Sequence, residues 1–212
     1  MKYRANTDYQ FIEFLRSRLK KPLPGRDAHM KMVPLQDGKP FRPMEAPSNS
    51  KQSAVIALLS IDTQELLFTL RSSKLRKHSG QISFPGGRLD EGENFKEAAL
   101  RETYEEVGIK PDKIEIIGEL SQLYVPPSNS VIQPLLGITE QIEELTLNPD
   151  EVEEAFTVKL DILKHPNTKK WTEWNFGGAV SDVPYYDVHP EVPLWGATAI
   201  MLSEFLEVIS EK

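Results

Sequence analysis

Three glutamates stand close together in a stretch that reads as a helix, and their spacing suits metal chemistry. Glu102, Glu105 and Glu106 occupy positions i, i+3 and i+4, which share one face of a helix with 3.6 residues per turn. Like charges at this spacing destabilise a helix unless a cation neutralises them. Hard divalent ions such as Mg²⁺ prefer oxygen ligands and bridge carboxylates to phosphates. These residues therefore predict a site for a divalent metal ion that could also bind a phosphate group.

The three glutamates belong to a longer pattern that runs from Gly87 to Ile109. Glu93 precedes the helix, where a carboxylate interacts favourably with the helix dipole, and Arg101 lies one turn before Glu105 and can contact it. The run RETYEE alone would fit an ordinary acidic surface helix. The complete spacing, however, resembles the conserved box of the Nudix hydrolases without a gap.

The resemblance implies a role for each box residue. Glu93 and Arg101 would hold the loop–helix–loop together, while the helix glutamates would bind Mg²⁺ or Mn²⁺ with the carbonyl of Gly86 as a further ligand. The catalytic residues expected on this basis are Glu93, Arg101, Glu102, Glu105 and Glu106. The expected metal ligands are Gly86, Glu102, Glu105 and Glu106.

The rest of the box is expected to shape and pack the helix. Gly86 and Gly87 before the helix suit a tight turn, and Gly108 after it suits a C-terminal cap. The residues expected to pack the helix against a sheet, on the side opposite the glutamates, are Leu100, Thr103, Tyr104 and Val107.

A second motif, LFTLRSSKLRKHSGQISFPGGRLD, lies directly upstream, from Leu67 to Asp90. It resembles the additional motif of the Nudix subgroup that hydrolyses coenzyme A. Coenzyme A carries a diphosphate and a separate 3′-phosphate, so its site needs cations besides the metal, and arginine can bind phosphate through two parallel hydrogen bonds. A short charge run is more often a solvated loop, but its place beside the box favours binding. The substrate-binding residues implied are Arg71, Ser72, Arg76, His78, Gln81 and Arg88.

The two motifs together imply hydrolysis of coenzyme A to 3′,5′-ADP and 4′-phosphopantetheine. Acyl-coenzyme A would react likewise, because the bond broken is far from the thiol. The general base is open: it is either a box glutamate or one of Glu151, Glu153 and Glu154. Two other functions are also open. One is hydrolysis of a different nucleoside diphosphate derivative, such as ADP-ribose or a dinucleotide. The other is a non-catalytic ligand sensor with the same fold, which the intact set of glutamates disfavours.

Composition narrows the class of protein. A chain of 212 residues fits one domain. With 25 Lys and Arg against 32 Asp and Glu, the net charge is −7, which disfavours a nucleic-acid partner. The absence of cysteine excludes disulfides and thiolate sites. The charged N-terminus lacks the apolar core of a signal peptide, and the longest apolar run, Ala54 to Leu59, is too short to span a membrane. We therefore expect a soluble cytoplasmic protein that acts on a small molecule. The oligomeric state is open, a homodimer included.

The apolar pattern predicts the elements that position these residues. Helices are expected over residues 7–20 and 197–209, the first with a stripe of Phe11, Leu15 and Leu19 that packs on the core. Strands are expected over residues 53–60, 65–71, 114–120, 131–139, 155–160 and 184–188. We expect an α/β fold, the Nudix α/β/α sandwich with a mixed β-sheet.

We expect the chain to divide into two parts at residue 50. Residues 1–50 would form an N-terminal helix and a proline-rich lead-in packed on the core, with residues 21–50 running extended over the surface. Residues 51–212 would form the Nudix hydrolase domain.

Overall fold

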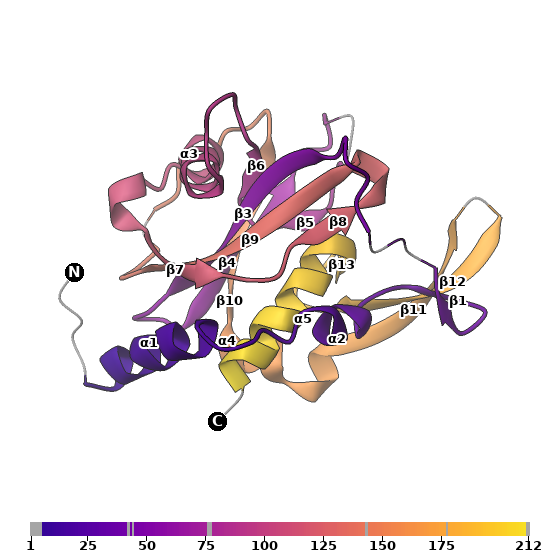
Figure 1. Ribbon diagram of the computed structural model, residues 1–212, viewed down its shortest axis with the longest axis horizontal. Helices are drawn as coiled ribbons and strands as arrows, with labels where there is room; N and C mark the ends of the chain where they lie inside the picture. The colour runs from indigo at the N-terminus through magenta and orange to yellow at the C-terminus, as the bar shows by residue number, and fades with distance from the viewer. Residues whose placement is uncertain are drawn as a thin grey trace.

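An eight-stranded mixed sheet forms the centre of the protein (Figure 1). The computed structural model describes residues 6–41, 43, 45–75, 78–142, 144–176 and 178–210. The strands of the sheet are β3 (Lys51–Ser60), β4 (Glu65–Arg71), β5 (Ile82–Ser83), β6 (Gly86–Arg88), β7 (Glu115–Glu119), β8 (Leu123–Val125), β9 (Ser130–Thr139) and β10 (Val152–Lys159). Its main path is β10-β4-β3-β9-β7. Strands β3 and β9 run parallel and the other pairs antiparallel, so the predicted mixed sheet is confirmed.

The sheet lies between helices. Helix α3 (Phe95–Val107), the predicted acidic helix, covers one face and contacts β3 and β6. Helices α1 (Asn6–Leu19) and α5 (Gly196–Ser210) lie on the opposite face, where α1 contacts β7 and α5 contacts β8 (Figure 1). The predicted α/β/α sandwich is therefore confirmed.

Strand β3 explains why the run SAVIALLS contains no alternation of polar and apolar residues. Ala54, Ile56 and Leu58 point towards α3 and pack with Ala98 and Ala99. The intervening residues Val55, Ala57 and Leu59 belong to the core on the other side, together with α1 and α5. Side chains of a strand alternate between faces, so a strand buried on both sides is apolar throughout.

Helix α1 packs on the core as its apolar stripe predicts. Ile12 and Leu15 are fully buried, and Phe11 and Leu19 are partly buried against the same cluster. The stripe therefore belongs to the core of the protein rather than to a free surface.

The expectation that residues 21–50 run extended over the surface is wrong in part. Helix α2 (Arg26–Met30) interrupts them and packs on α5, and His29 is buried. His29 Nε2 lies 3.1 Å from Glu204 Oε2, and Glu204 also accepts hydrogen bonds from the backbone of Gly25 (2.9 Å) and Ser121 (3.0 Å). Burial raises the pKa of Glu204, but the contacts with His29 and Ser121 outweigh it, so the pKa is lowered. The division of the chain at residue 50 stays a prediction.

A second, five-stranded sheet lies beside the first and was only partly expected. Its strands are β1 (Leu35–Gln36), β2 (Lys39–Pro40), β11 (Lys169–Phe176), β12 (Ala179–Tyr186) and β13 (Leu194–Trp195). The hairpin of β11 and β12 extends away from the large sheet (Figure 1). The strand expected over 184–188 begins at Ala179 instead, the one expected over 155–160 begins at Val152, and β11 was not expected.

Short helical turns connect the remaining elements. They are α4 (Leu160–Lys164), η1 (Pro111–Lys113), η2 (Pro126–Ser128) and η3 (Pro166–Thr168). Among the described residues, no helix combines the length and the apolar character needed to cross a bilayer.

Candidate active site

Two glycines of β6 lie in close contact with their neighbours, Gly86 with β3 and Gly87 with Glu102 of α3. Gly86 has φ 146°, and a Cβ there would lie 2.3 Å from the carbonyl oxygen of Ala54. A Cβ on Gly87 would lie 2.3 Å from the carboxyl carbon of Glu102. Both contacts are shorter than atoms tolerate. The backbone of β3 therefore requires glycine at residue 86, and a side chain at residue 87 would displace the Glu102 carboxylate.

Helix α3 is fixed at both ends by its own sequence. The Asn94 side chain accepts a hydrogen bond from the backbone of Glu97 (3.0 Å), and the Glu97 carboxylate accepts one from the backbone of Asn94 (3.0 Å). This reciprocal pair is a capping box. Gly108, with φ 78°, ends the helix in the left-handed conformation, as expected.

The packing face of α3 is shifted from the predicted one. Thr103 and Val107 are buried as expected, but Tyr104 is 50% exposed, so its predicted packing is wrong. Ala98 and Ala99 are fully buried against β3. The buried face of α3 is therefore centred on Ala98, Ala99, Thr103 and Val107, and Tyr104 lies outside it.

Three carboxylates meet at the junction of α3, β6 and the start of β10. One carboxylate oxygen from each of Glu102, Glu106 and Glu151 lies within 4.8 Å of the others. Glu106 is almost fully buried, with 1% of its surface exposed, and it accepts a hydrogen bond from the Gly86 N–H at 3.1 Å. We call Glu102, Glu106 and Glu151 the carboxylate group.

Glu105 lies outside the carboxylate group. Its carboxylate accepts a hydrogen bond from Arg101 Nη1 at 3.1 Å, and 48% of the side chain is exposed. Its role as a metal ligand stays a prediction.

Glu151 reaches the carboxylate group from a distant part of the chain. The Asn148 N–H donates to the carbonyl of Glu106 at 3.0 Å, which docks the segment before β10 on the end of α3. Of the later glutamates that the sequence offers as a base, only Glu151 joins the carboxylate group. Glu153 accepts a hydrogen bond from the backbone of Ser73 (3.4 Å), and Glu154 lies 3.2 Å from His189.

Burial disfavours the ionised form of these carboxylates. For Glu106 this effect raises the pKa to about 7, and the hydrogen bond from Gly86 and the nearby Arg71 offset it only in part. Burial also raises the pKa of Glu102, against the opposing effect of Arg101. A cation among these carboxylates would remove the cost.

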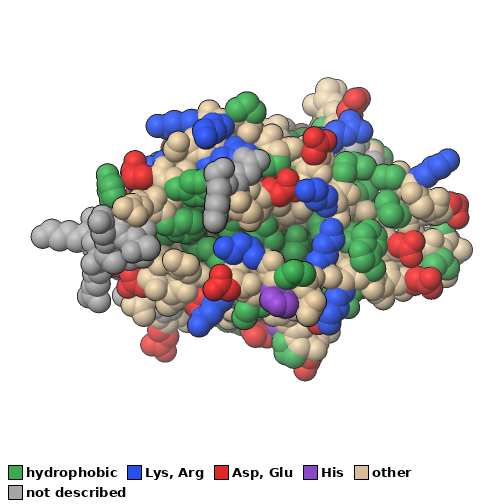
Figure 2. Space-filling view, turned by 90° about the horizontal axis from the view of Figure 1, so that it is seen from below, with side chains coloured by type: hydrophobic (Ala, Val, Ile, Leu, Met, Phe, Trp, Pro, Cys, Tyr) green, Lys and Arg blue, Asp and Glu red, His purple; other side chains and the backbone are tan. Residues whose placement is uncertain are grey.

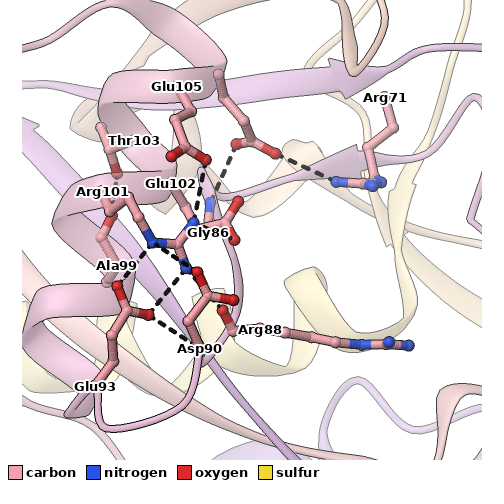
Figure 3. A network of polar contacts seen from close by, with 11 residues as sticks. Arg71, Gly86, Arg88, Asp90, Glu93, Ala99, Arg101, Glu102, Thr103 and Glu105 are labelled. Carbon is pink, nitrogen blue, oxygen red and sulfur yellow. Dashed lines mark hydrogen bonds and ion pairs between the residues drawn. The ribbon is translucent and has the colours of Figure 1, made fainter.

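Arg101 holds the loop before α3 against the helix (Figure 3). Its Nε and Nη2 donate to the two carboxylate oxygens of Glu93, at 2.7 and 3.0 Å, and its Nη2 also donates to the carbonyl of Arg88 at 3.0 Å. Its Nη1 donates to Glu102 at 3.0 Å. The hydrogen bonds from Arg101 and from the backbone of Asp90 lower the pKa of Glu93 to about 2. The expected contact with Glu105 is present, and the guanidinium joins the loop to a member of the carboxylate group.

Most of the predicted substrate residues line one pocket of about 960 Å³ that also contains the carboxylate group. These are Arg71, His78, Gln81 and Arg88. Arg71 Nη1 lies 3.4 Å from Glu106 Oε1, and His78 Nδ1 lies 3.0 Å from Gln81 Oε1. Ser72 is buried beside the pocket, where its hydroxyl accepts a hydrogen bond from the backbone of Lys74 (3.4 Å). Arg76 lies outside the described residues.

The opposite side of the pocket was not predicted from the sequence. The second sheet and its flanking residues contribute Phe41, Phe176 and Trp195 to the lining. Figure 2 shows a face on which hydrophobic side chains gather beside Lys and Arg side chains. No local sequence motif predicts that these residues line a site, because they come from three separate segments.

The carboxylate group fits a hard divalent cation. It offers carboxylate oxygens only, which are the ligands that Mg²⁺ and Mn²⁺ prefer. Such an ion would offset the free-energy cost of the buried Glu106 charge, which is the cost that raises its pKa. The absence of a side chain at Gly87 leaves room for the Glu102 carboxylate. The three carboxylates of Glu102, Glu106 and Glu151 lie close enough together to share one such ion.

Comparison with known proteins agrees with this geometry. Residues 50–176 match the NUDIX domain. The chain is 34% identical over 182 residues to Nudix hydrolase 3 of Caenorhabditis elegans, covering 78% of this chain and 76% of that protein. It is 37% identical over 121 residues to a peroxisomal coenzyme A diphosphatase of Mus musculus, covering 56% and 51%. It is 32% identical over 148 residues to a mitochondrial coenzyme A diphosphatase of Homo sapiens, covering 68% and 63%. The chain thus spans only about half to two thirds of the two diphosphatases.

Solved structures show the same fold. A MutT/nudix family protein from Enterococcus faecalis superposes with a TM-score of 0.51 at 15% identity, covering 99% of this chain and 76% of that one. The MutT protein of Methanosarcina mazei gives a TM-score of 0.50 at 18% identity, covering 80% and 100%. The domain match over more than half of the chain, together with the box geometry around Arg101 and Glu102, establishes that the chain belongs to the Nudix hydrolase family.

Proposed function

We propose that this Nudix hydrolase cleaves the diphosphate of coenzyme A or acyl-coenzyme A, with Mg²⁺ or Mn²⁺, to 3′,5′-ADP and (acyl-)4′-phosphopantetheine. The observation that carries the proposal is the meeting of Glu102, Glu106 and Glu151 in a pocket that Arg71 and Arg88 also line. The two relatives named as coenzyme A diphosphatases, and the upstream motif, support this substrate over other diphosphates.

Arginines supply the charge that phosphate recognition needs. Arg71 and Arg88 line the pocket, and each can donate two hydrogen bonds to one phosphate. Coenzyme A brings more phosphate charge than a simple diphosphate, and we propose that Arg76 binds its 3′-phosphate. His78 and Gln81, which contact each other, line the pocket near it in the sequence and would also contact the substrate.

The carboxylate group would hold the metal and activate water. A divalent ion held by Glu102 and Glu106, with Gly86 and Glu105 as further predicted ligands, would lower the pKa of a bound water and neutralise the diphosphate. We propose Glu151 as the general base. It would accept a proton from the water whose oxygen bonds to phosphorus, while the bond from that phosphorus to the bridging oxygen breaks. Arg101 would keep Glu102 in position through its 3.0 Å hydrogen bond.

A substrate panel tests the proposal. Coenzyme A, ADP-ribose and a diadenosine polyphosphate are each incubated with the protein and Mg²⁺ or Mn²⁺, and the products are identified by mass spectrometry. We expect the highest kcat/KM for coenzyme A, with 3′,5′-ADP among its products. Preference for ADP-ribose would replace the proposed substrate, and no turnover on the panel despite metal binding would favour a non-catalytic sensor.

A cytoplasmic location stays a prediction, and the oligomeric state is open, a homodimer included. Light scattering of the eluted protein tests the oligomeric state, and imaging of the tagged full chain tests the location.

A further inference from the structure

The acidic and arginine side chains that line the pocket come from one part of the fold, which also contributes apolar residues such as Val55 and Ile82. The large sheet and α3 contribute Arg71, Arg88 and the carboxylate group. The described residues that the second sheet and its flanks contribute are uncharged: Pro34, Phe41, Pro43, Phe176 and Trp195. A volume of about 960 Å³ lies near the upper end of the range for small-molecule sites. The pocket therefore has room for more than a diphosphate, and the added room is apolar.

The aromatic residues of the pocket pack against one another and against Trp174. The rings of Trp174 and Trp195 meet edge to face with centroids 4.6 Å apart, and Phe176 lies against Trp195 at 5.9 Å. Phe41 extends the cluster, 6.4 Å from Phe176. Even so, Phe41 remains 44% exposed and Phe176 37% exposed. Exposed aromatic residues that line a pocket gain stability when an apolar ligand covers them.

The ring geometry suits a flexible chain better than a planar base. Phe176 and Trp195 are inclined by 32°, and Phe41 and Phe176 by 48°. Neither described pair forms the parallel slot in which a nucleobase would stack. The 3′-phosphate next to adenine also requires cations, and the described basic residues of the pocket lie on the opposite side.

We propose that Phe41, Phe176 and Trp195 bind the S-acyl chain of the substrate, so that the enzyme prefers acyl-coenzyme A to free coenzyme A. The inference rests on the proposed function, because it names the part of that substrate which the aromatic side recognises. The nucleotide half would stay beside Arg71 and Arg88, and the apolar half would extend across the pocket to the second sheet.

The test compares two substrates that differ only in the acyl chain. For each variant we define the acyl ratio as kcat/KM for octanoyl-coenzyme A divided by kcat/KM for free coenzyme A. We expect an acyl ratio of about ten in the parent protein, a discrimination that a hydrophobic pocket readily gives. Phe176→Ala, and independently Phe41→Ala, should lower this ratio about fivefold or more.

Trp171→Ala is the matched control. Trp171 lies on the same strand as Phe176 and is 50% exposed, but it does not line the pocket, so its replacement should leave the acyl ratio unchanged. Melting temperatures of all variants report whether each is folded.

Three outcomes would overturn the inference. A parental acyl ratio of one or below would show that the chain is not recognised. Equal losses on both substrates in the Phe176 and Phe41 variants would place the nucleotide at the aromatic side. Failure of the parent to hydrolyse free or acylated coenzyme A would overturn the proposed function as well, which distinguishes it from the first two outcomes.

Discussion

Glu151 lies in the same carboxylate group as Glu106, although several strands separate them in the chain. The backbone of α3 fixes this relationship. The Asn148 N–H donates to the carbonyl of Glu106 at 3.0 Å, and the carbonyl of Asn148 accepts hydrogen bonds from Glu151 (3.0 Å) and Val152 (2.8 Å). The position of the Glu151 side chain therefore depends on main-chain contacts, and its charge can be removed without removing the turn.

Glu151→Gln should lower kcat for coenzyme A about a hundredfold or more, because an amide cannot accept the proton from water. Its affinity for Mn²⁺, measured by calorimetry, should change far less than that of a Glu106 variant. The matched control is Glu153→Gln, whose carboxylate contacts the backbone of Ser73 outside the carboxylate group. Equal activity of the Glu151 and Glu153 variants would remove Glu151 from the mechanism.

Glu106→Gln should abolish most metal binding and lower kcat/KM about a hundredfold or more, because a neutral amide is a weaker ligand for a hard cation. It should also stabilise the metal-free protein at pH 8. The parent carries a costly buried charge there, since burial raises the pKa of Glu106 to about 7. Melting curves in EDTA measure this, and a variant that melts below the parent at pH 8 would contradict it.

Arg101→Lys should weaken metal affinity and activity by about 10- to 100-fold, as loss of a residue that orients a ligand commonly does. Lysine keeps the charge but cannot make the parallel hydrogen bonds to Glu93 while also bonding Glu102. Mn²⁺ titration and steady-state kinetics report the two effects. Parental metal affinity in this variant would show that Arg101 does not position Glu102.

The stability of the metal-free protein should fall as pH rises from about 4.5 to 7. In this window the folded protein binds more protons than the unfolded chain, because burial raises the pKa of Glu106 from 4.5 to about 7 and also raises that of Glu102. Saturating Mg²⁺ should remove the decline. Urea unfolding at pH 5.5, 7 and 8, with EDTA or Mg²⁺, is the measurement, and a metal-free stability that rises over this range would be inconsistent with the assignment.

Glu93 has the opposite effect on the pH dependence of stability, because hydrogen bonds from Arg101 and from the backbone of Asp90 lower its pKa to about 2. Its contribution is present above pH 4.5 and is lost as pH falls towards 2.

Local parts of the site could be predicted because a helix converts sequence spacing into geometry. The offset of four residues between Arg101 and Glu105 predicts a contact along α3, and the structure contains it. The hydrogen bond from Arg101 to its chain neighbour Glu102 was not predicted. The capping box of Asn94 and Glu97 was also readable from its spacing, although it was not predicted.

Parts of the site that depend on tertiary structure could not be predicted in the same way. In the sequence, Glu151 is one of three later glutamates that are equivalent candidates for the general base. The turn at Asn148 brings it next to Glu102 and Glu106. The aromatic side of the pocket combines Phe41, Phe176 and Trp195 from three segments. Strand β11 mixes charged and aromatic residues because it lies on a projecting hairpin, so its sequence lacks the simple alternation of a half-buried strand.

The most direct test of the central claim is a crystal structure with Mn²⁺, located by its anomalous scattering. We predict a peak beside the carboxylates of Glu102 and Glu106, about 2.0–2.3 Å from their oxygens. A map with no peak there, and with Glu102, Glu106 and Glu151 turned apart, would contradict the account.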